Sequence, residues 1–280
     1  MMFKIVEKKR LNPQVTLMKF SAPHVVKNAK AGQFVVLKMD EKGERIPLTI
    51  VDTDKKENTL TVIFQEVGTT TKCLANLDKG GSIMDIIGPL GRSTHVGRAS
   101  RVIAIGGGVG TAEIYPVAKA FKEAGNEVAS IIGARNKELL LLIDEMKMAS
   151  DQLHIATDDG SFGKKGFVTD ILKELLEKGK YDLVYAVGPI FMMKAVALLT
   201  KQYNLKTIVS LNANMVDATG MCGTCRVTVA GKTKFACVDG PDFDAHEIDF
   251  EEFINRDRRF KDREEESLKC YEKTGCRRKG

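Results

Sequence analysis

The feature that most constrains the fold is the alternation of apolar strands with helices between residues 98 and 210. "RVIAIGGGVG" (101–110) has the composition of a buried strand that runs into glycines, and "TAEIYPVAKAFKEAG" (111–125) follows with helical periodicity. Two further helical patterns, "NKELLLLIDEMKMA" and "FVTDILKELLEKG", separate the strands "EVASIIGA", "LHIATDD" and "DLVYAVGP". Strands and helices of this length in alternation predict a parallel sheet with crossover helices.

Four glycines, Gly106, Gly107, Gly108 and Gly110, lie between the first of these strands and its helix. Without Cβ atoms the backbone can turn tightly and let a phosphate approach the amides at the helix N-terminus, where the helix dipole favours negative charge. A plain strand–helix turn is the alternative. Because so many glycines destabilise a free turn entropically, we favour a phosphate-binding turn.

The pattern departs from the standard dinucleotide fingerprint at two positions. Ala112 follows Thr111 where a third glycine is usual, and Arg135 stands where an acidic residue would bind a ribose 2′-hydroxyl. Arg135 would tolerate a 2′-phosphate, so the spacing alone leaves NAD and NADP open. Two more glycine-bearing turns, "TDDGSFGKKG" and "AVGPIFMMKA", follow later strands. Ligands of open parallel sheets lie beyond the carboxyl ends of the strands, so the three turns together predict a nucleotide site at that edge.

Residues 1–97 have an all-β pattern. Short β-branched runs such as "FKIVEKKRL", "VTLMKFSA" and "TLTVIFQEV" alternate with turn residues, which predicts a small barrel or sandwich. Within this part, "RIPLTI" and "FQEVGTTTKCL" place small and hydroxyl residues after strands. Such residues suit a pyrophosphate held by amides and hydroxyls, and a polar turn is the alternative.

Composition and charge exclude some classes of protein. Lys and Arg exceed Asp and Glu by 43 to 37, but the excess is spread along the chain, whereas a nucleic-acid binder concentrates it on one face. The long apolar segment "LVYAVGPIFMMKAVALL" contains Gly188-Pro189 and Lys194 and is shorter than the roughly 20 residues of a membrane span. The N-terminus lacks the apolar stretch of a signal peptide. We therefore expect a cytoplasmic protein without a membrane span, in a compartment where clustered cysteines bind metal more often than they form disulfides.

The order of motifs resembles the ferredoxin–NADP reductase superfamily, in particular its subgroup with a C-terminal [2Fe–2S] segment. The motifs are a P-L-[ST] strand, a G-x-T-T turn, a G-G-G-x-G turn, a later G-P turn and a "CGTC…C-x-D-G-P" ending. The resemblance implies an α/β plus β fold in four parts: an N-terminal antiparallel β-barrel that binds FAD (1–97), a Rossmann-like parallel-sheet domain that binds NAD(H) (98–210), a small iron–sulfur segment (211–250) and a charged tail (251–280).

The resemblance also implies binding residues. For FAD they are Pro47, Leu48 and Thr49 at the flavin ring, with Phe64, Gln65, Gly68, Thr70 and Thr71 around the ribityl chain and pyrophosphate. For NAD(H) they are Gly106, Gly107, Gly108, Gly110, Thr111, Asp159, Gly188 and Pro189. Two positions differ from the pattern. Ile46 separates Arg45 from the proline, which weakens an arginine–flavin phosphate contact, and Val187 replaces the cysteine that often precedes G-P beside the nicotinamide.

The stretch "DATGMCGTCRVTVAGKTKFAC" has the spacing D-x4-C-x2-C-x11-C. Plant-type [2Fe–2S] segments use C-x4-C-x2-C with a distant fourth cysteine, so Asp217 takes the place of the first ligand, and Cys222, Cys225 and Cys237 take the others. A structural zinc would accept the same donors and is the alternative, although a zinc clip gives no reason for a flavin domain beside it. Because carboxylate is a harder ligand than thiolate, we expect a potential different from that of an all-cysteine relative.

The other three cysteines lie outside this spacing. Cys73 falls on an apolar pattern and is predicted to be a core residue. Cys270 and Cys276 lie in the charged tail, which we expect to be a solvated helix or a loose segment.

The resemblance implies an oxidoreductase that exchanges hydride between NAD(H) and FAD and passes single electrons through a [2Fe–2S] cluster. Cofactors then perform the chemistry, and we assign no catalytic side chain. The subgroup includes the small subunit of the electron-bifurcating NADH-dependent ferredoxin:NADP oxidoreductase, the dihydroorotate dehydrogenase electron-transfer subunit and the sulfide dehydrogenase β-subunit.

Asp217 favours the bifurcating reductase, since the dihydroorotate enzyme typically has cysteine there. That choice implies a larger partner subunit with its own flavin, [4Fe–4S] clusters and an NADP(H) site, an indirect link to ferredoxin, and NAD(H) at this chain. The other two systems, or a non-catalytic electron-carrier module, are the alternatives.

Overall fold

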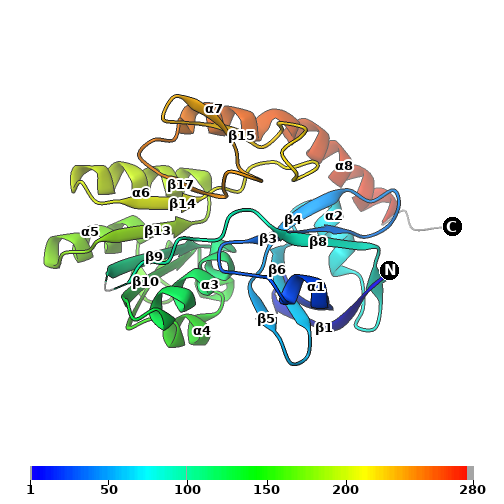
Figure 1. The fold of residues 1–280 in the computed structure, drawn as a ribbon, viewed down its shortest axis with the longest axis horizontal. Coiled ribbons are helices and arrows are strands. Elements are labelled where there is room, and N and C mark those ends of the chain that lie inside the picture. Colours follow the sequence, from blue (N-terminus) through cyan, green and yellow to red (C-terminus); the bar gives the residue numbers. More distant parts are fainter. Residues whose placement is uncertain (1, 99, 276–280) are drawn as a thin grey trace.

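The computed structural model describes residues 2–98 and 100–275. Its N-terminal part contains two antiparallel sheets, with strand orders β5-β6-β2-β1-β7 and β4-β3-β8 (Figure 1). The elements are β1 (Phe3–Asn12), β2 (Val15–Ser21), α1 (Pro23–Val26), β3 (Phe34–Lys38), β4 (Arg45–Thr49), β5 (Asp52–Asp54), β6 (Thr59–Gln65), α2 (Thr69–Ala75), β7 (Ser82–Ile83) and β8 (Asp85–Leu90).

These strands are antiparallel, as the sequence predicts, and their hydrogen bonds join them into two separate sheets. Among the described residues, β4 is hydrogen-bonded only to β3 and lies at the edge of its sheet. Pro47 stands in the middle of β4, and a proline has no N–H to donate to a second neighbouring strand, so it is confined to edge strands. Buried side chains such as Phe20, Leu60 and Leu74 form the shared core of this part, and Cys73 lies in the same core, as predicted.

The middle of the chain forms a sheet of strand order β12-β11-β10-β9-β13-β14-β17, as the alternation of strands and helices predicts. The pairs from β12 to β14 are parallel, and β17 is antiparallel to β14. The strands are β9 (Arg101–Gly107), β10 (Glu127–Ala134), β11 (Gln152–Thr157), β12 (Lys164–Lys165), β13 (Leu183–Val187), β14 (Thr207–Ser210) and β17 (Asp242–Asp244).

Helices cover both faces of this sheet (Figure 1). On one face α3 (Gly110–Glu123) and α4 (Ile143–Met148) bury Val117, Phe121 and Met146. On the other, α5 (Val168–Lys178) and α6 (Ile190–Gln202) bury side chains such as Leu172 and Val196. The central strands are apolar on both sides, which is typical of a parallel sheet between two helical layers.

The prediction of one helix over 136–149 is wrong. The segment contains a short 3-10 helix, η1 (Lys137–Leu139), then Leu142 with a φ of 51°, and only then α4. Leu141 is buried against Val15 and Ile63 of the N-terminal part, whereas Leu142 also packs on the α3 side of the sheet. A continuous helix cannot direct consecutive leucines into two such clusters, so tertiary packing overrides the helical propensity.

The C-terminal part begins with the hairpin of β15 (Arg226–Val229) and β16 (Lys232–Phe235). After β17 come α7 (Phe250–Asp257), η2 (Arg258–Phe260) and α8 (Lys261–Thr274). The predicted charged tail is therefore helical up to Thr274, and α8 reaches back to α2 of the N-terminal part (Figure 1). Within the described ranges, no helix has the length and apolar character needed to cross a membrane.

Candidate functional site

The glycine turn after β9 packs directly on the G-P turn after β13. A Cβ at Gly110 would lie 2.5 Å from the carbonyl oxygen of Val187 and 2.8 Å from Cα of Gly188. A Cβ at Gly107 would lie 2.4 Å from Sδ of Met192 and 3.2 Å from Cδ of Pro189. Two motifs about 80 residues apart are thus brought together at the carboxyl edge of the sheet, where nucleotides bind in open α/β folds. This close packing explains why Gly107 and Gly110 have no room for a side chain.

Gly108 differs from its neighbours because its position faces open space. Its φ is 58°, and no heavy atom lies within 4 Å of an added Cβ. Its N–H donates to the carbonyl oxygen of Gly133 at 2.8 Å, which fixes the turn on the next strand. Gly108 is therefore the point of the turn at which a ligand can approach the backbone, whereas Thr111 is buried in the first turn of α3.

Arg135 and Asp159, from two different strand ends, lie side by side at this edge. The Asp159 N–H donates to the carbonyl oxygen of Arg135 at 3.2 Å. Hydrogen bonds from the hydroxyl and the backbone amide of Ser161 lower the pKa of the Asp159 carboxyl. Lys137, whose N–H donates to Oγ of Ser161 at 2.8 Å, places its ammonium 5.5 Å from the ring centroid of Phe162. The motifs did not indicate Lys137, Ser161 or Phe162, because only the register of β10 and β11 brings them together.

Glu113 is a further residue that the motifs did not indicate. It lies half-buried in the first turn of α3, three residues after Gly110. Burial raises the pKa of its carboxyl to about 7. The signal was present in the sequence as a lone acidic residue after the glycine turn, but such a residue is also common in the exposed first turn of any helix.

The residues assigned to FAD lie on β4, β6 and α2. Pro47, Leu48 and Thr49 are half-buried on the edge strand β4. Phe64 is only 2% exposed, so its side chain belongs to the core and only its backbone can face a ligand. Gln65 follows at the partly open end of β6.

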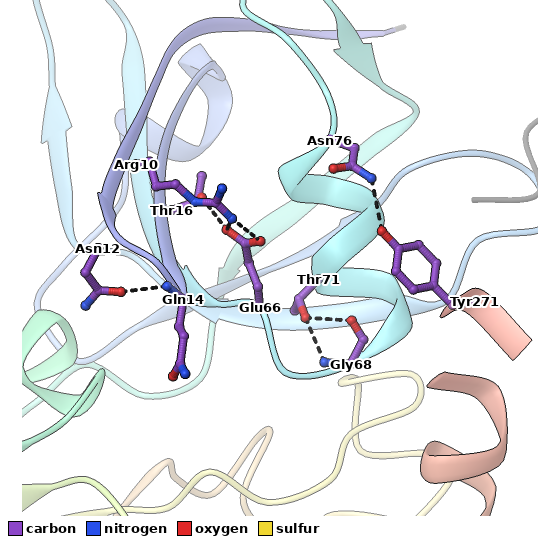
Figure 2. A network of polar contacts seen from close by, with 9 residues as sticks. All are labelled: Arg10, Asn12, Gln14, Thr16, Glu66, Gly68, Thr71, Asn76 and Tyr271. Atoms are coloured by element: carbon purple, nitrogen blue, oxygen red, sulfur yellow. Dashed lines mark hydrogen bonds and ion pairs between the residues drawn. The ribbon is translucent and has the colours of Figure 1, made fainter. Parts of the chain in front are cut away.

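The G-x-T-T turn is ordered by its own hydroxyl groups. Oγ1 of Thr71 accepts from the N–H of Gly68 at 3.1 Å and donates to the Gly68 carbonyl oxygen at 3.0 Å. The hydroxyl of Thr70 donates to Oε2 of Glu44 at 2.6 Å. Figure 2 shows the Thr71–Gly68 pair beside Glu66, which Arg10 and Thr16 hold from the opposite side.

The cysteine segment brings two of its predicted ligands into direct contact. Cys225 precedes β15, Cys237 follows β16, and each is only 2% exposed. Their sulfur atoms lie 3.2 Å apart. Burial, reinforced by the hydrogen bond and charge of Cys225, raises the pKa of the Cys237 thiol to about 12.

The other two predicted ligands lie together in the more exposed loop. The Asp217 carboxylate accepts from the N–H of Thr219 at 2.9 Å and from the N–H of Cys222 at 2.8 Å. Cys222 is exposed. Gly220 and Gly223, with φ of 86° and 65°, let the loop turn around this pair.

Three thiols and one carboxylate in one loop and hairpin have the donor chemistry of an iron–sulfur cluster, since soft thiolates select such clusters over hard ions. In the described part of the chain, however, no three His, Cys, Asp or Glu side chains converge on one metal position. The four residues lie as two pairs: Cys225 and Cys237 are buried, and Asp217 and Cys222 lie in the exposed loop. The two amide bonds leave each Asp217 oxygen a free lone pair for a metal.

A short connecting segment holds the cysteine hairpin against the rest of the molecule. The Arg92 N–H donates to the carbonyl oxygen of Gly240 at 2.7 Å, and Nε of Arg92 donates to that of Val238 at 3.2 Å. The Thr94 hydroxyl donates to Oδ2 of Asp242 at 2.7 Å, and the hydroxyl of Tyr185 on β13 donates to Oδ1. Burial raises the pKa of Asp242 to about 6. The three parts of the chain thus meet at one buried carboxyl.

Comparisons with known proteins agree with this arrangement. Residues 212–249 match the family described as the iron–sulfur cluster binding domain of dihydroorotate dehydrogenase B, and residues 104–198 match the oxidoreductase NAD-binding domain. The Thermotoga maritima protein named dihydroorotate dehydrogenase B (NAD(+)), electron transfer subunit homolog, is 45% identical over 96% of this chain and 95% of its own length. The probable dihydroorotate dehydrogenase B electron transfer subunit of Methanopyrus kandleri is 35% identical over 81% of this chain and 84% of its own.

Two solved structures place the fold. One is the structure of the NADH-dependent reduced ferredoxin-NADP oxidoreductase, described in connection with flavin-based electron bifurcation. Its sequence is 42% identical to this chain, the TM-score is 0.92, and the match covers 97% of this chain and 98% of that one. Phthalate dioxygenase reductase is 15% identical with a TM-score of 0.60, over 82% of this chain and 86% of its own. The second likeness concerns the fold alone.

Proposed function

This chain belongs to the family of dihydroorotate dehydrogenase B electron transfer subunits and their homologues, and we propose that it serves as the NAD(H)-linked electron-transfer subunit of an electron-bifurcating NADH-dependent ferredoxin:NADP oxidoreductase. The resemblance inferred from the motifs is confirmed at the level of the family, as is its oxidoreductase class with NAD-binding and iron–sulfur-binding parts. When bound, FAD would exchange hydride with the nicotinamide, and the cluster would carry single electrons.

We assign NAD(H) to the carboxyl edge of the parallel sheet. The position of Gly108 faces open space, so the nucleotide phosphates can approach the backbone at the N-terminus of α3. The packed turns at Gly107, Gly110 and Gly188 fix the position of that backbone, and Pro189 begins the neighbouring helix. Arg135 and Asp159 lie where they would contact the adenosine ribose.

We assign FAD to β4, the end of β6 and the turn before α2 in the N-terminal part. The edge strand β4 would present Pro47, Leu48 and Thr49 to the flavin ring. The end of β6 and the turn before α2 would hold the ribityl chain and pyrophosphate through Gln65 and the G-x-T-T backbone. The hydrogen bonds of Thr70 to Glu44 and of Thr71 to Gly68 keep this turn ordered before a ligand arrives.

Asp217, Cys222, Cys225 and Cys237 are the proposed holders of a [2Fe–2S] cluster. Cys225 and Cys237 supply a buried anchor on a hairpin, and Cys222 lies at the exposed end. Met221, 87% exposed, directly precedes Cys222, and Val216, 57% exposed, directly precedes Asp217. Exposed apolar groups of this kind mark protein interfaces, so this face suits a larger partner subunit that exchanges electrons with the cluster.

The observation that carries the choice of reaction is the likeness to the electron-bifurcating structure over 97% of the chain, together with Asp217 in place of a cysteine. A second candidate is the electron-transfer subunit of a dihydroorotate dehydrogenase. The names of the relatives and the matched iron–sulfur family favour it.

The holo-complex of this chain with its native large subunit separates the two candidates. For the bifurcating function, anaerobic NADPH should reduce ferredoxin only when NAD⁺ is also present, because the two electron acceptors are coupled. Dihydroorotate should not reduce NAD⁺. Dihydroorotate-dependent NADH formation, without NAD⁺-dependent ferredoxin reduction, would establish the second candidate instead.

A further inference from the structure

A pocket of about 480 Å³ lies between the N-terminal part and the C-terminal helix. Its wall comes from the β1–β2 hairpin, the end of β6, α2 and α8, and its lining residues include Arg10, Gln65, Glu66, Lys72 and Tyr271. Its volume is in the range of small-molecule sites. Because Gln65 belongs to the segment assigned above to the flavin ribityl and pyrophosphate, the pocket continues from that site.

We propose that this pocket binds the adenosine half of FAD, and that α8 completes the flavin site by supplying Tyr271. The proposal rests on the assignment of FAD to the N-terminal part. It gives the charged tail, to which the sequence assigns no role, a place in cofactor selection. A mononucleotide flavin would leave this pocket unused.

Glu66 provides a fixed acceptor for the ribose hydroxyls. Its carboxylate is held by Nη2 of Arg10 at 3.0 and 2.8 Å and by the Thr16 hydroxyl at 2.8 Å (Figure 2). Two carboxylate oxygens offer about four lone-pair positions, and these contacts occupy three. A carboxylate that accepts from a ribose hydroxyl is a recurring device for adenosine recognition, and here its orientation is set before the ligand arrives.

Tyr271 and Lys72 provide the other features that an adenine nucleotide needs. The Lys72 ammonium lies 5.9 Å from the centroid of the Tyr271 ring, so a cation and an aromatic face border the same pocket. A base stacks on an aromatic ring irrespective of hydrogen-bond pattern, and an ammonium near the phosphate end opposes its negative charge.

The position of Tyr271 is fixed by contacts between α8 and α2. Its hydroxyl accepts from Nδ2 of Asn76 at 3.1 Å (Figure 2). One helical turn earlier, the Ser267 hydroxyl lies 3.0 Å from that of Thr69 in the first turn of α2. The side chain of Tyr271 also packs against the N-terminal core. The helix therefore presents the ring to the pocket as a preorganised wall.

The test compares FAD with FMN on the full chain after its flavin has been removed. The dissociation constant of each flavin is measured by fluorescence quenching for the wild type, Tyr271→Ala, Tyr271→Phe and the exposed neighbour control Glu272→Ala. Loss of a stacking ring should weaken FAD binding about tenfold or more and leave FMN binding unchanged. Tyr271→Phe keeps the ring and should bind FAD within about twofold of the wild type, as should Glu272→Ala.

Equal FAD affinity in Tyr271→Ala and the wild type, or equal weakening of FAD and FMN, would overturn the proposal while leaving FAD at this chain intact. If the wild type binds neither flavin, both this proposal and the assignment of FAD to this chain fail. Adenosine monophosphate distinguishes FAD from a separate adenine nucleotide in the pocket. It should compete with FAD and not with FMN, whereas binding of adenosine monophosphate to the FAD-loaded chain would mean a separate nucleotide site and overturn the proposal.

Discussion

Asp217 has one role that the structure shows and one that we propose. Its carboxylate caps the loop by accepting from the amides of Thr219 and Cys222, and these amide bonds lower the pKa of the carboxyl. The same oxygens are the proposed iron ligand. The spacing of the segment predicted the position of this residue, but not its hydrogen bonds, because amide directions depend on the turn geometry at Gly220 and Gly223.

Substitution of Asp217 tests the ligand role directly. Asp217→Ala should leave a vacant iron site and a labile cluster, with iron well below two per chain after purification. Asp217→Cys should retain the cluster and shift its reduction potential, because ligand softness and charge change. Cys222→Ala, Cys225→Ala and Cys237→Ala should each lose the cluster. Iron analysis and the EPR spectrum of the reduced protein provide the readouts.

Cys270→Ala is the matched control, since Cys270 lies exposed on α8, away from the ligand loop in sequence, and it should keep full iron. Cys276, for which the sequence predicts the same outcome, lies outside the described residues. Full iron and an unchanged EPR signal in Asp217→Ala would mean that the fourth ligand lies elsewhere.

At the scale of elements, β17 joins the cysteine segment to the nucleotide-binding sheet. It follows Cys237 by only a few residues and pairs with β14, and its Asp242 accepts from Thr94 and Tyr185. The sequence predicted strands and helices from 98 to 210 but not this added strand. The strand has only three residues, "DFD", which is too short for an alternating hydrophobic pattern to be recognised. It becomes a strand because it pairs with β14 in the folded sheet.

The buried carboxyl of Asp242 should make stability depend on pH. Its pKa rises from 3.8 to about 6 on folding, so between these values the folded state binds the proton more tightly. The unfolding free energy should therefore fall as pH rises through this window, by about 3 kcal/mol in total. Asp242→Asn does not titrate and should lose this part of the dependence.

Urea unfolding of wild type and Asp242→Asn at pH 4 and pH 7 measures the effect as a difference between the two proteins. Other carboxyl groups are common to both and cancel. A difference in unfolding free energy that stays constant over the window would show that folding does not raise the pKa of Asp242.

The whole molecule was partly predictable from the sequence. Motif order identified the family, and the position of each glycine turn after a strand placed Gly108, Gly188 and Asp159 at one sheet edge. Long-range packing was beyond the sequence. The return of α8 to α2 through Tyr271 depends on contacts nearly 200 residues apart, and the place of β4 at the edge of its sheet depends on which strands pair. Local propensity carries no information about either feature.

The central claim is that this chain accepts hydride from NADH and passes single electrons through its [2Fe–2S] cluster. The most direct test is an anaerobic titration of the purified, cofactor-loaded chain with NADH. Flavin absorbance and the EPR spectrum of the cluster are the readouts. NADH should bleach the flavin and generate the signal of a reduced [2Fe–2S] centre, and NADPH should do so more slowly. Flavin reduction that is faster with NADPH, or a flavin that NADH leaves oxidised, would contradict the account.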